Sequence, residues 1–174
     1  KLLGLGYPGG PILDRLAKLG DAQAIPFKLP LVKRGKNFTS FSGLKTAVVD
    51  YARENKLEEI LKKRPIEECP QALNLIASFQ KTVAKIVDRL MQHLSTSLNA
   101  KRWAITGGVA CNSEIRSRLG ESAKKLGVEL FIPRPKFCTD NASMIALVGH
   151  AYLSKGLKSD IDLNATATES RMPT

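Results

Sequence analysis

Three segments of the sequence place glycines or a carboxylate or amide side chain where a helix is expected to begin. Their sequences are YPGGPILD at 7–14, TGGVACN at 106–112 and CTDNA at 138–142. Glycine has no Cβ, so a phosphate or nucleoside can approach the backbone closely there, and a helix N-terminus attracts anions. The Asp14 carboxylate is suited to ribose hydroxyls or a polar headgroup. Together these segments predict a site for a nucleotide-like ligand.

Each segment also has a purely structural interpretation. A double glycine after a strand is often only a tight turn, and Asn112 can be a plain N-cap. Asp14 and Asp140 can serve as helix caps or as partners of a helix dipole. A metal site needs further ligands, and the histidines, His93 and His150, each occur singly within an expected helix. Taken one at a time, these motifs leave both interpretations open.

The expected elements alternate between helices and strands. Apolar residues recur every three or four positions over 72–98, which predicts one long helix with a continuous apolar face. Strands are expected at 27–32 and 38–41, joined by a turn at 34–37, and at 103–106 and 128–132. Further helices are expected at 12–19, from a Ser42 cap onwards, weakly at 56–64, from Asn112 or Ser113 to 126, and at 139–153. This order indicates an α/β fold.

The charge balance limits the kinds of partner. The chain has 174 residues, with 27 Lys and Arg against 16 Asp and Glu, for a net charge of +11. Such a surplus predicts a polyanionic partner, most often nucleic acid, and the alternative is a solvated basic surface. No run of about 18 apolar residues is present, so no transmembrane helix is expected. Three cysteines without a CxxC pair fit a reducing compartment, and a start at Lys1 suggests a fragment.

The sequence closely resembles the C-terminal half of the TsaD threonylcarbamoyltransferase family. The resemblance rests on five motifs in the same order and spacing: GLGYPGGP, TSFSGLKTAV, ASFQ, TGGVACN and CTDNASMIA. It covers residues 1–157, which are expected to form one lobe, and leaves 158–174 as a poorly ordered tail. The implied fold is α/β of the actin-like ATPase (ASKHA) type, with a mixed sheet, packed helices and one long helix, and with the active site between two lobes.

The resemblance also implies a reaction. The family transfers threonylcarbamoyl from threonylcarbamoyl-adenylate to N6 of the adenosine just 3′ of the tRNA anticodon. The matching positions are Gly10, Asp14 and Asn112 for the adenylate, Gly107 and Gly108 for phosphate approach, and Asp140 for the metal. The family's other metal ligands, two histidines four residues apart, are absent from this sequence. The chain is therefore expected to hold half a site and to be inactive alone.

The implied partners follow from the same resemblance. They are one divalent metal ion (iron or zinc), tRNA, partner subunits similar to TsaB and TsaE, and the chain's own N-terminal lobe, with no membrane. The implied compartment is the cytoplasm or the mitochondrial matrix. We name Lys33, Arg34 and Lys36 the basic hairpin cluster; this cluster and 62–64 are candidate contacts to tRNA, or else solvated loops. Two alternative functions are a catalytically dead scaffold module of the modification complex and a lobe of an actin-like small-molecule kinase.

Overall fold

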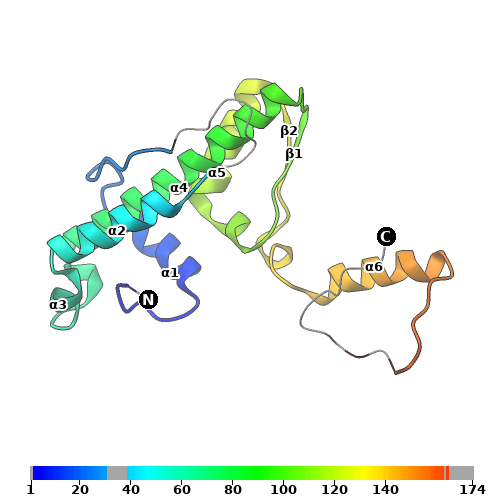
Figure 1. The fold of residues 1–174 in the computed structure, drawn as a ribbon, viewed down its shortest axis with the longest axis horizontal. Coiled ribbons are helices and arrows are strands. Elements are labelled where there is room, and N and C mark those ends of the chain that lie inside the picture. Colours follow the sequence, from blue (N-terminus) through cyan, green and yellow to red (C-terminus); the bar gives the residue numbers. More distant parts are fainter. Residues whose placement is uncertain (1, 31–38, 163, 165–174) are drawn as a thin grey trace. The chain divides into compact units, whose positions relative to one another are not determined.

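The computed structural model describes residues 2–30, 39–162 and 164 (Figure 1). The chain divides into two compact units, Lys1–Thr139 and Asp140–Thr174. The described part of the first unit contains the helices α1 (Gly9–Leu16), α2 (Ser42–Glu54), α3 (Leu57–Leu61), α4 (Pro70–Ser97) and α5 (Ser113–Leu126). It also contains the short 3₁₀ turns η1 (Ala17–Leu19), η2 (Ile66–Glu68), η3 (Gly108–Cys111) and η4 (Pro135–Phe137), and the strands β1 (Arg102–Ala104) and β2 (Glu129–Phe131).

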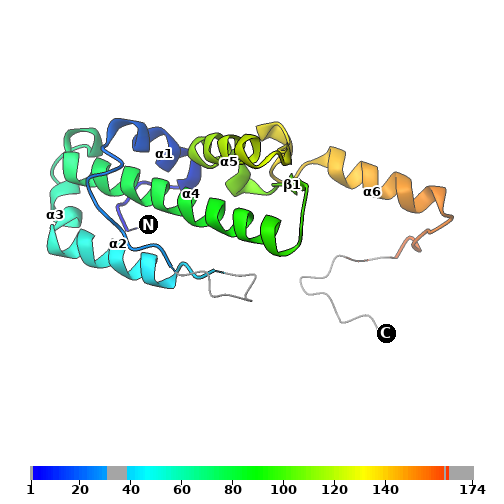
Figure 2. The same ribbon diagram turned by 90° about the horizontal axis from the view of Figure 1, so that it is seen from above.

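Helix α4 is the long helix that the apolar periodicity predicted. Pro70 stands in its first turn, where a missing backbone N–H leaves no hydrogen bond unmade. Figure 2 shows α2 along one side of α4, and α1 and α5 along the other. Three core clusters lie along α4 and join it to these neighbours. Their buried members from α4 are Ala72 and Leu75 toward α2 and α3, Leu73 and Ile76 toward α1, and Ala84 toward α5.

The strands and α5 form a β-α-β unit. β1 and β2 are parallel, with Trp103 opposite Leu130, and α5 connects them. Trp103 is buried against Ala84 of α4 and against Leu119 of α5, so this unit is held on α4 by its apolar side chains. Helix α5 ends at Gly127, which has the left-handed backbone conformation typical of such a terminus (φ 63°). This parallel pair confirms an α/β arrangement, but it is smaller than the mixed sheet that the resemblance implied.

The second unit contains α6 (Ala142–Ser154). Asn141 caps this helix, because its Oδ1 accepts a hydrogen bond from the Met144 amide at 3.1 Å. The cap is thus Asn141 and not the preceding Asp140. Within the described residues of this unit, no side chain of α6 is buried.

Two expectations for the region before α2 need correction. Ser42 is the first residue of α2 and does not cap it; the hydroxyl at this helix start belongs to Ser40, which accepts from the Ser42 amide at 3.3 Å. The expected hairpin at 27–41 lies partly outside the described residues, and the basic hairpin cluster lies entirely outside them. The described residues 27–30 and 39–41 are not in strands.

Candidate functional site

The Asp14 side chain joins two helices that are far apart in the sequence. Its Oδ1 accepts hydrogen bonds from the amide and the hydroxyl of Ser113, at 3.1 and 2.8 Å. Asp14 is the sixth residue of α1, so it does not lie in the first turn of its own helix as the sequence suggested. It is instead a carboxylate at the N-terminus of α5, where its charge favours the α5 dipole.

Gln80 of α4 connects Asp14 to Asn112. Its Nε2 donates to Asp14 Oδ1 at 3.1 Å, and its Oε1 accepts from Asn112 Nδ2 at 3.0 Å. Gln80 is 8% exposed although it stands on the apolar side of α4. Because a buried amide is costly unless it is hydrogen-bonded, both of its polar atoms are paired. Asp14, Gln80, Asn112 and Ser113 thus form one hydrogen-bonded group, which we call the Asp14 cluster.

Asn112 is the N-cap of α5. Its Oδ1 accepts from the Ile115 amide at 3.0 Å, and its own amide donates to the Val109 carbonyl. The Ser113 amide is also used, by Asp14. The sequence suggested that the first amides of α5 could bind a ligand phosphate; two of them are instead satisfied within the chain.

The glycines matched to the ligand site leave space around themselves. A Cβ on Gly10 or Gly107 would have no heavy atom within 4 Å of it. Gly107 has φ +86°, a conformation that L-residues rarely adopt, so the turn between β1 and η3 requires glycine. Gly108 would place a Cβ in ordinary contact with the Thr139 side chain, at 3.7 Å. The packing of this chain therefore does not explain why position 10 lacks a side chain.

The segment after α1 is fixed to the backbone of α4. Gly20 lies so close to α4 that a Cβ there would be 2.8 Å from the Asn74 nitrogen and closer still to the Leu73 carbonyl. Asn74 Oδ1 accepts from the Asp21 amide at 2.8 Å. The buried Ser78 hydroxyl donates to the Asp21 carbonyl at 3.3 Å and accepts from the Ile25 amide at 3.1 Å. Through these contacts, α4 sets the position of α1 and hence of Asp14.

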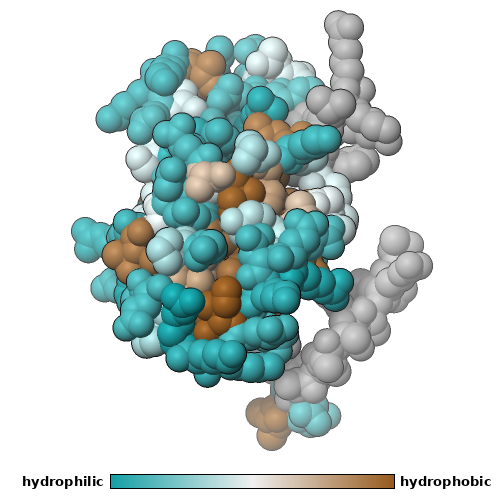
Figure 3. Space-filling view, turned by 90° about the vertical axis from the view of Figure 1, so that its left-hand side faces the viewer, coloured by the Kyte–Doolittle hydropathy of each residue, from teal (hydrophilic) through white to brown (hydrophobic). Residues whose placement is uncertain are grey.

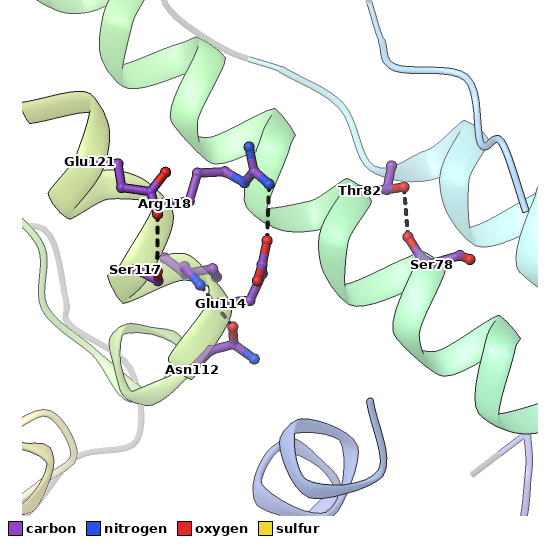
Figure 4. Close-up of polar contacts among 8 residues, drawn as sticks. Ser78, Thr82, Asn112, Glu114, Ser117, Arg118 and Glu121 are labelled. Carbon is purple, nitrogen blue, oxygen red and sulfur yellow. Dashed lines mark hydrogen bonds and ion pairs between the residues drawn. The ribbon is translucent and has the colours of Figure 1, made fainter. Parts of the chain in front are cut away.

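A cleft of about 430 Å³ lies beside the Asp14 cluster. It is lined by Ala17, Lys18, Ala22, Ala77, Gln80, Lys81, Ser113, Glu114 and Ser117. Figure 4 shows Asn112 at the start of α5 and the ion pair between Glu114, in the first turn, and Arg118, whose atoms are 3.0 Å apart. The cleft lining is therefore mixed, with three alanines beside polar side chains and charges of both signs.

Two cysteines lie at the entrance to α5. Arg116 Nη2 donates to the Pro133 carbonyl at 2.6 Å and to Cys138 Sγ at 3.3 Å, and the Cys111 thiol donates to the Pro135 carbonyl. Partial burial and the contact with Cys138 raise the pKa of the Cys111 thiol, against a lowering by Arg116. These bonds attach the 133–138 segment to the start of α5.

Asp140 is the residue that the sequence assigned to the metal. It is exposed and belongs to the second unit. Across the described residues, no three His, Cys, Asp or Glu side chains are grouped as a metal site would require. The assignment of Asp140 as a metal ligand therefore stays a prediction from the sequence.

The second basic segment, 62–64, follows α3 and is exposed. Lys62 pairs with Glu58 one turn earlier, at 3.1 Å. The side of the molecule seen in Figure 3 is predominantly hydrophilic, with apolar side chains showing in a few places. The pair contributes little to stability because it is exposed. Since residues 62–64 are all exposed, their cations are accessible to a polyanion.

Comparison with known proteins identifies the family. The family model described as TsaD, tRNA N6-adenosine threonylcarbamoyltransferase, matches residues 1–147. The chain belongs to the TsaD family. It is 42% identical over 165 residues to the tRNA N6-adenosine threonylcarbamoyltransferase of Syntrophotalea carbinolica, covering 95% of this chain and 46% of that protein. It is 43% identical over 169 residues to the protein of the same name from Trichlorobacter lovleyi, covering 96% and 46%.

This chain of the TsaD family spans less than half the length of the curated relatives that it matches. Among its described helices, none is both long and apolar enough to cross a lipid bilayer. The structure adds two residues, Gln80 and Ser113, to the site positions matched from the sequence. A signal for Gln80 was available, since it is a polar residue inside the apolar stripe of α4 and ends the ASFQ motif. Ser113 gave no signal beyond its place after Asn112.

Proposed function

We propose that this chain is the C-terminal half of a tRNA N6-adenosine threonylcarbamoyltransferase. Together with the rest of its protein it transfers threonylcarbamoyl from threonylcarbamoyl-adenylate to N6 of the adenosine 3′ of the anticodon. The observation that carries the proposal is the Asp14 cluster, which unites Asp14 and Asn112. The sequence separation of Asp14 and Ser113 is 99 residues, so this meeting is a product of the fold. Both Asp14 and Asn112 occupy positions that the resemblance assigned to the adenylate.

The free atoms of the cluster suit an adenosine. Within the described residues, no donor bonds to Oδ2 of Asp14, which leaves that oxygen for ribose hydroxyls. Asn112 Nδ2 carries a second hydrogen beyond the one given to Gln80. The space at Gly10 and Gly107 allows a ligand to approach the backbone. These features support roles for Gly10, Asp14 and Asn112 in holding the adenylate, and for Gly107 and Gly108 in the approach of its phosphate.

The reaction needs positioning more than it needs a nucleophilic side chain. The N6 nitrogen forms a bond to the carbamoyl carbon, the bond from that carbon to the phosphate oxygen breaks, and N6 loses a proton. An adenosine N6 is a poor nucleophile, so rate depends on orientation of the two substrates and stabilisation of the departing phosphate. This chain's part in the reaction is to hold the adenylate through Asp14 and Asn112.

A divalent metal ion, iron or zinc, would polarise the carbonyl when bound. We propose Asp140 as one ligand, with the others outside this chain. A single carboxylate does not make a site, because a catalytic metal of this kind takes about three protein ligands.

The remaining parts of the proposal concern context. The fold is one lobe of an actin-like ATPase architecture, residues 1–157 form that lobe, and residues 158–174 form a tail. The net charge of +11 supports tRNA as the nucleic-acid partner, and the cytoplasm is the proposed compartment. TsaB-like and TsaE-like subunits and the N-terminal lobe are the proposed protein partners.

Incorporation of labelled threonine into unmodified tRNA tests the proposal. The complete protein containing this chain should incorporate label from threonylcarbamoyl-adenylate, and the 174-residue chain alone should not exceed a no-enzyme control. Incorporation by the chain alone would contradict a divided site. A complete protein that stays inactive with metal and partner subunits, but still captures those subunits in a pulldown, would favour a scaffold module.

A further inference from the structure

We infer that Gln80 is a positioning residue for the adenylate, because its side-chain amide fixes both Asp14 and Asn112. This inference rests on the proposed function, since it concerns how that ligand site is held in shape. Gln80 need not touch the ligand: its two polar atoms are already bonded to Asp14 and Asn112.

The hydrogen-bond chain permits one orientation of each amide. An ionised Asp14 only accepts, so Gln80 must present its Nε2 to it, and its Oε1 then faces Asn112. Asn112 must donate to it from Nδ2, which leaves the Asn112 Oδ1 to accept from the Ile115 amide at 3.0 Å. The helix cap and the carboxylate are thus the two ends of one polar chain with Gln80 at its centre. If Gln80 is removed, Asp14 keeps its bonds to Ser113 and Asn112 keeps its bond to Ile115, but the Asn112 Nδ2 loses its partner and the Asp14 Oδ1 loses one of three donors.

Burial makes this arrangement specific to a glutamine. Gln80 is 8% exposed, on a helix that buries mainly apolar side chains. A leucine of similar size would keep the packing of α4 against α1 and α5. Asp14 and Asn112 are only partly buried, so water can hydrogen-bond to the atoms that lose Gln80, and the cost to stability should be small. The expected effect of losing Gln80 therefore falls on ligand affinity, because Asp14 and Asn112 would no longer be preorganised.

Gln80→Leu and Gln92→Leu in the complete protein form a matched pair. Gln92 also lies on α4 and also reaches α5, where its Nε2 donates to Ser122 Oγ at 3.4 Å. Binding of adenosine monophosphate is measured by calorimetry, and the KM for threonylcarbamoyl-adenylate is measured in the transfer assay. We expect Gln80→Leu to lower the affinity for adenosine monophosphate and to raise the KM, each by about tenfold, which corresponds to the loss of one or two positioned hydrogen bonds. Gln92→Leu should leave both quantities unchanged. Melting temperature and bound metal should match the parent in both variants.

Gln80→Glu adds a second test, the pH dependence of nucleotide affinity, which would not change if residue 80 acted only through packing. An ionised Glu at 80 cannot donate to Asp14 and repels it, whereas a protonated Glu can donate, and the neighbouring carboxylate raises the pKa of the new side chain. Affinity for adenosine monophosphate in this variant should therefore approach the parent value as the pH falls from about 8 to about 6. The other ionisable side chains lining the adjacent cleft, Lys18, Lys81 and Glu114, are the same in every variant. Gln80→Leu should show no such recovery.

The outcomes separate the two levels of the proposal. A parent protein that binds no adenosine monophosphate would overturn the proposed function and this inference together. Parent-like affinity in Gln80→Leu, with affinity lost in Asp14→Ala, would overturn the role of Gln80 alone. Equal losses in Gln80→Leu and Gln92→Leu, accompanied by lower melting temperatures, would show that these glutamines act only through packing.

Discussion

Replacing Gly20 by alanine should disturb the ligand site indirectly, through the contact between Gly20 and the backbone of α4. The backbone at Gly20 has φ −108° and ψ 163°, which an alanine adopts without strain. The obstacle is contact, because the new Cβ would press on the Leu73 carbonyl and lie 2.8 Å from the Asn74 nitrogen. These are backbone atoms of α4 and cannot move individually, whereas carbon contacts normally need about 3.5 Å or more. The turn η1 must therefore retreat from α4 by a distance on the order of 1 Å.

That retreat has a thermodynamic and a functional magnitude. Overpacking of this kind costs about 1–3 kcal/mol, which for a unit of this size corresponds to a melting temperature lower by roughly 2–10 °C. Asp14 precedes Gly20 by less than two helical turns, and its bond to Gln80 is 3.1 Å long. A displacement near 1 Å would carry that pair beyond the reach of a hydrogen bond, about 3.5 Å. Gly20→Ala should thus weaken the binding of adenosine monophosphate as well as lower stability.

Gly120→Ala is the matched control. Gly120 lies within α5, and a Cβ there would have no heavy atom within 4 Å. Alanine in a helix interior is favoured over glycine by about 0.5–1 kcal/mol, so this variant should melt at or above the parent temperature. Thermal unfolding followed by far-UV circular dichroism, together with calorimetric titration, measures both effects. A Gly20→Ala protein with the parent's melting temperature and affinity would refute the reasoning that the contact of η1 with α4 sets the position of Asp14.

Three further predictions concern other parts of the chain. In the complete protein, Asp140→Ala should remove most of the bound metal, whereas Asp14→Ala should weaken adenylate binding and leave metal content intact; equal metal loss in both by elemental analysis would contradict this division. Alanine at all three positions of the basic hairpin cluster should reduce the log–log salt slope of tRNA binding by roughly two to three, because each phosphate contact contributes about 0.7–0.9, and an unchanged slope would place the contacts elsewhere. Alkylation of Cys111 by iodoacetamide should be slower at pH 8 than that of a free thiol and should still rise at higher pH, since its pKa is raised; a rate that levels off below pH 8 would contradict that shift.

Much of the fold could be predicted from local patterns. Apolar periodicity gave α4 almost to its ends. Capping by Asn112 or Ser113 gave the start of α5, and its expected end at Leu126 is also the observed one. The start of α2 was predicted less well, because Ser42 was expected to cap the helix but is its first residue, and the N-cap is Phe41, which makes no side-chain cap bond. The two strands were found because short apolar runs lie between helices, although periodicity alone does not give their pairing.

The candidate site was only partly predictable, for a physical reason. Asp14 and Asn112 were identified from their motifs, but which helix start Asp14 serves depends on a contact between α1 and α5. Gln80 has no motif chemistry of its own, and its role becomes visible only when three helices are packed together. Asp140 belongs to the second unit, and its role as a metal ligand comes from the family resemblance.

The bond between Asp14 and Ser113 bears on the order in which parts of the molecule fold. The Asn112 cap spans three residues, whereas Asp14 and Ser113 are 99 apart. Closing the longer loop costs about 3 kcal/mol more chain entropy than closing the short one, by the logarithmic dependence on loop length. Helices α1 and α5 each pack on α4 through their own core cluster, so both can form while the contact between Asp14 and Ser113 is still open. A partly folded population would retain most of its helical signal and bind no nucleotide, so nucleotide affinity, and not helix content, reports the fraction of molecules that has finished folding.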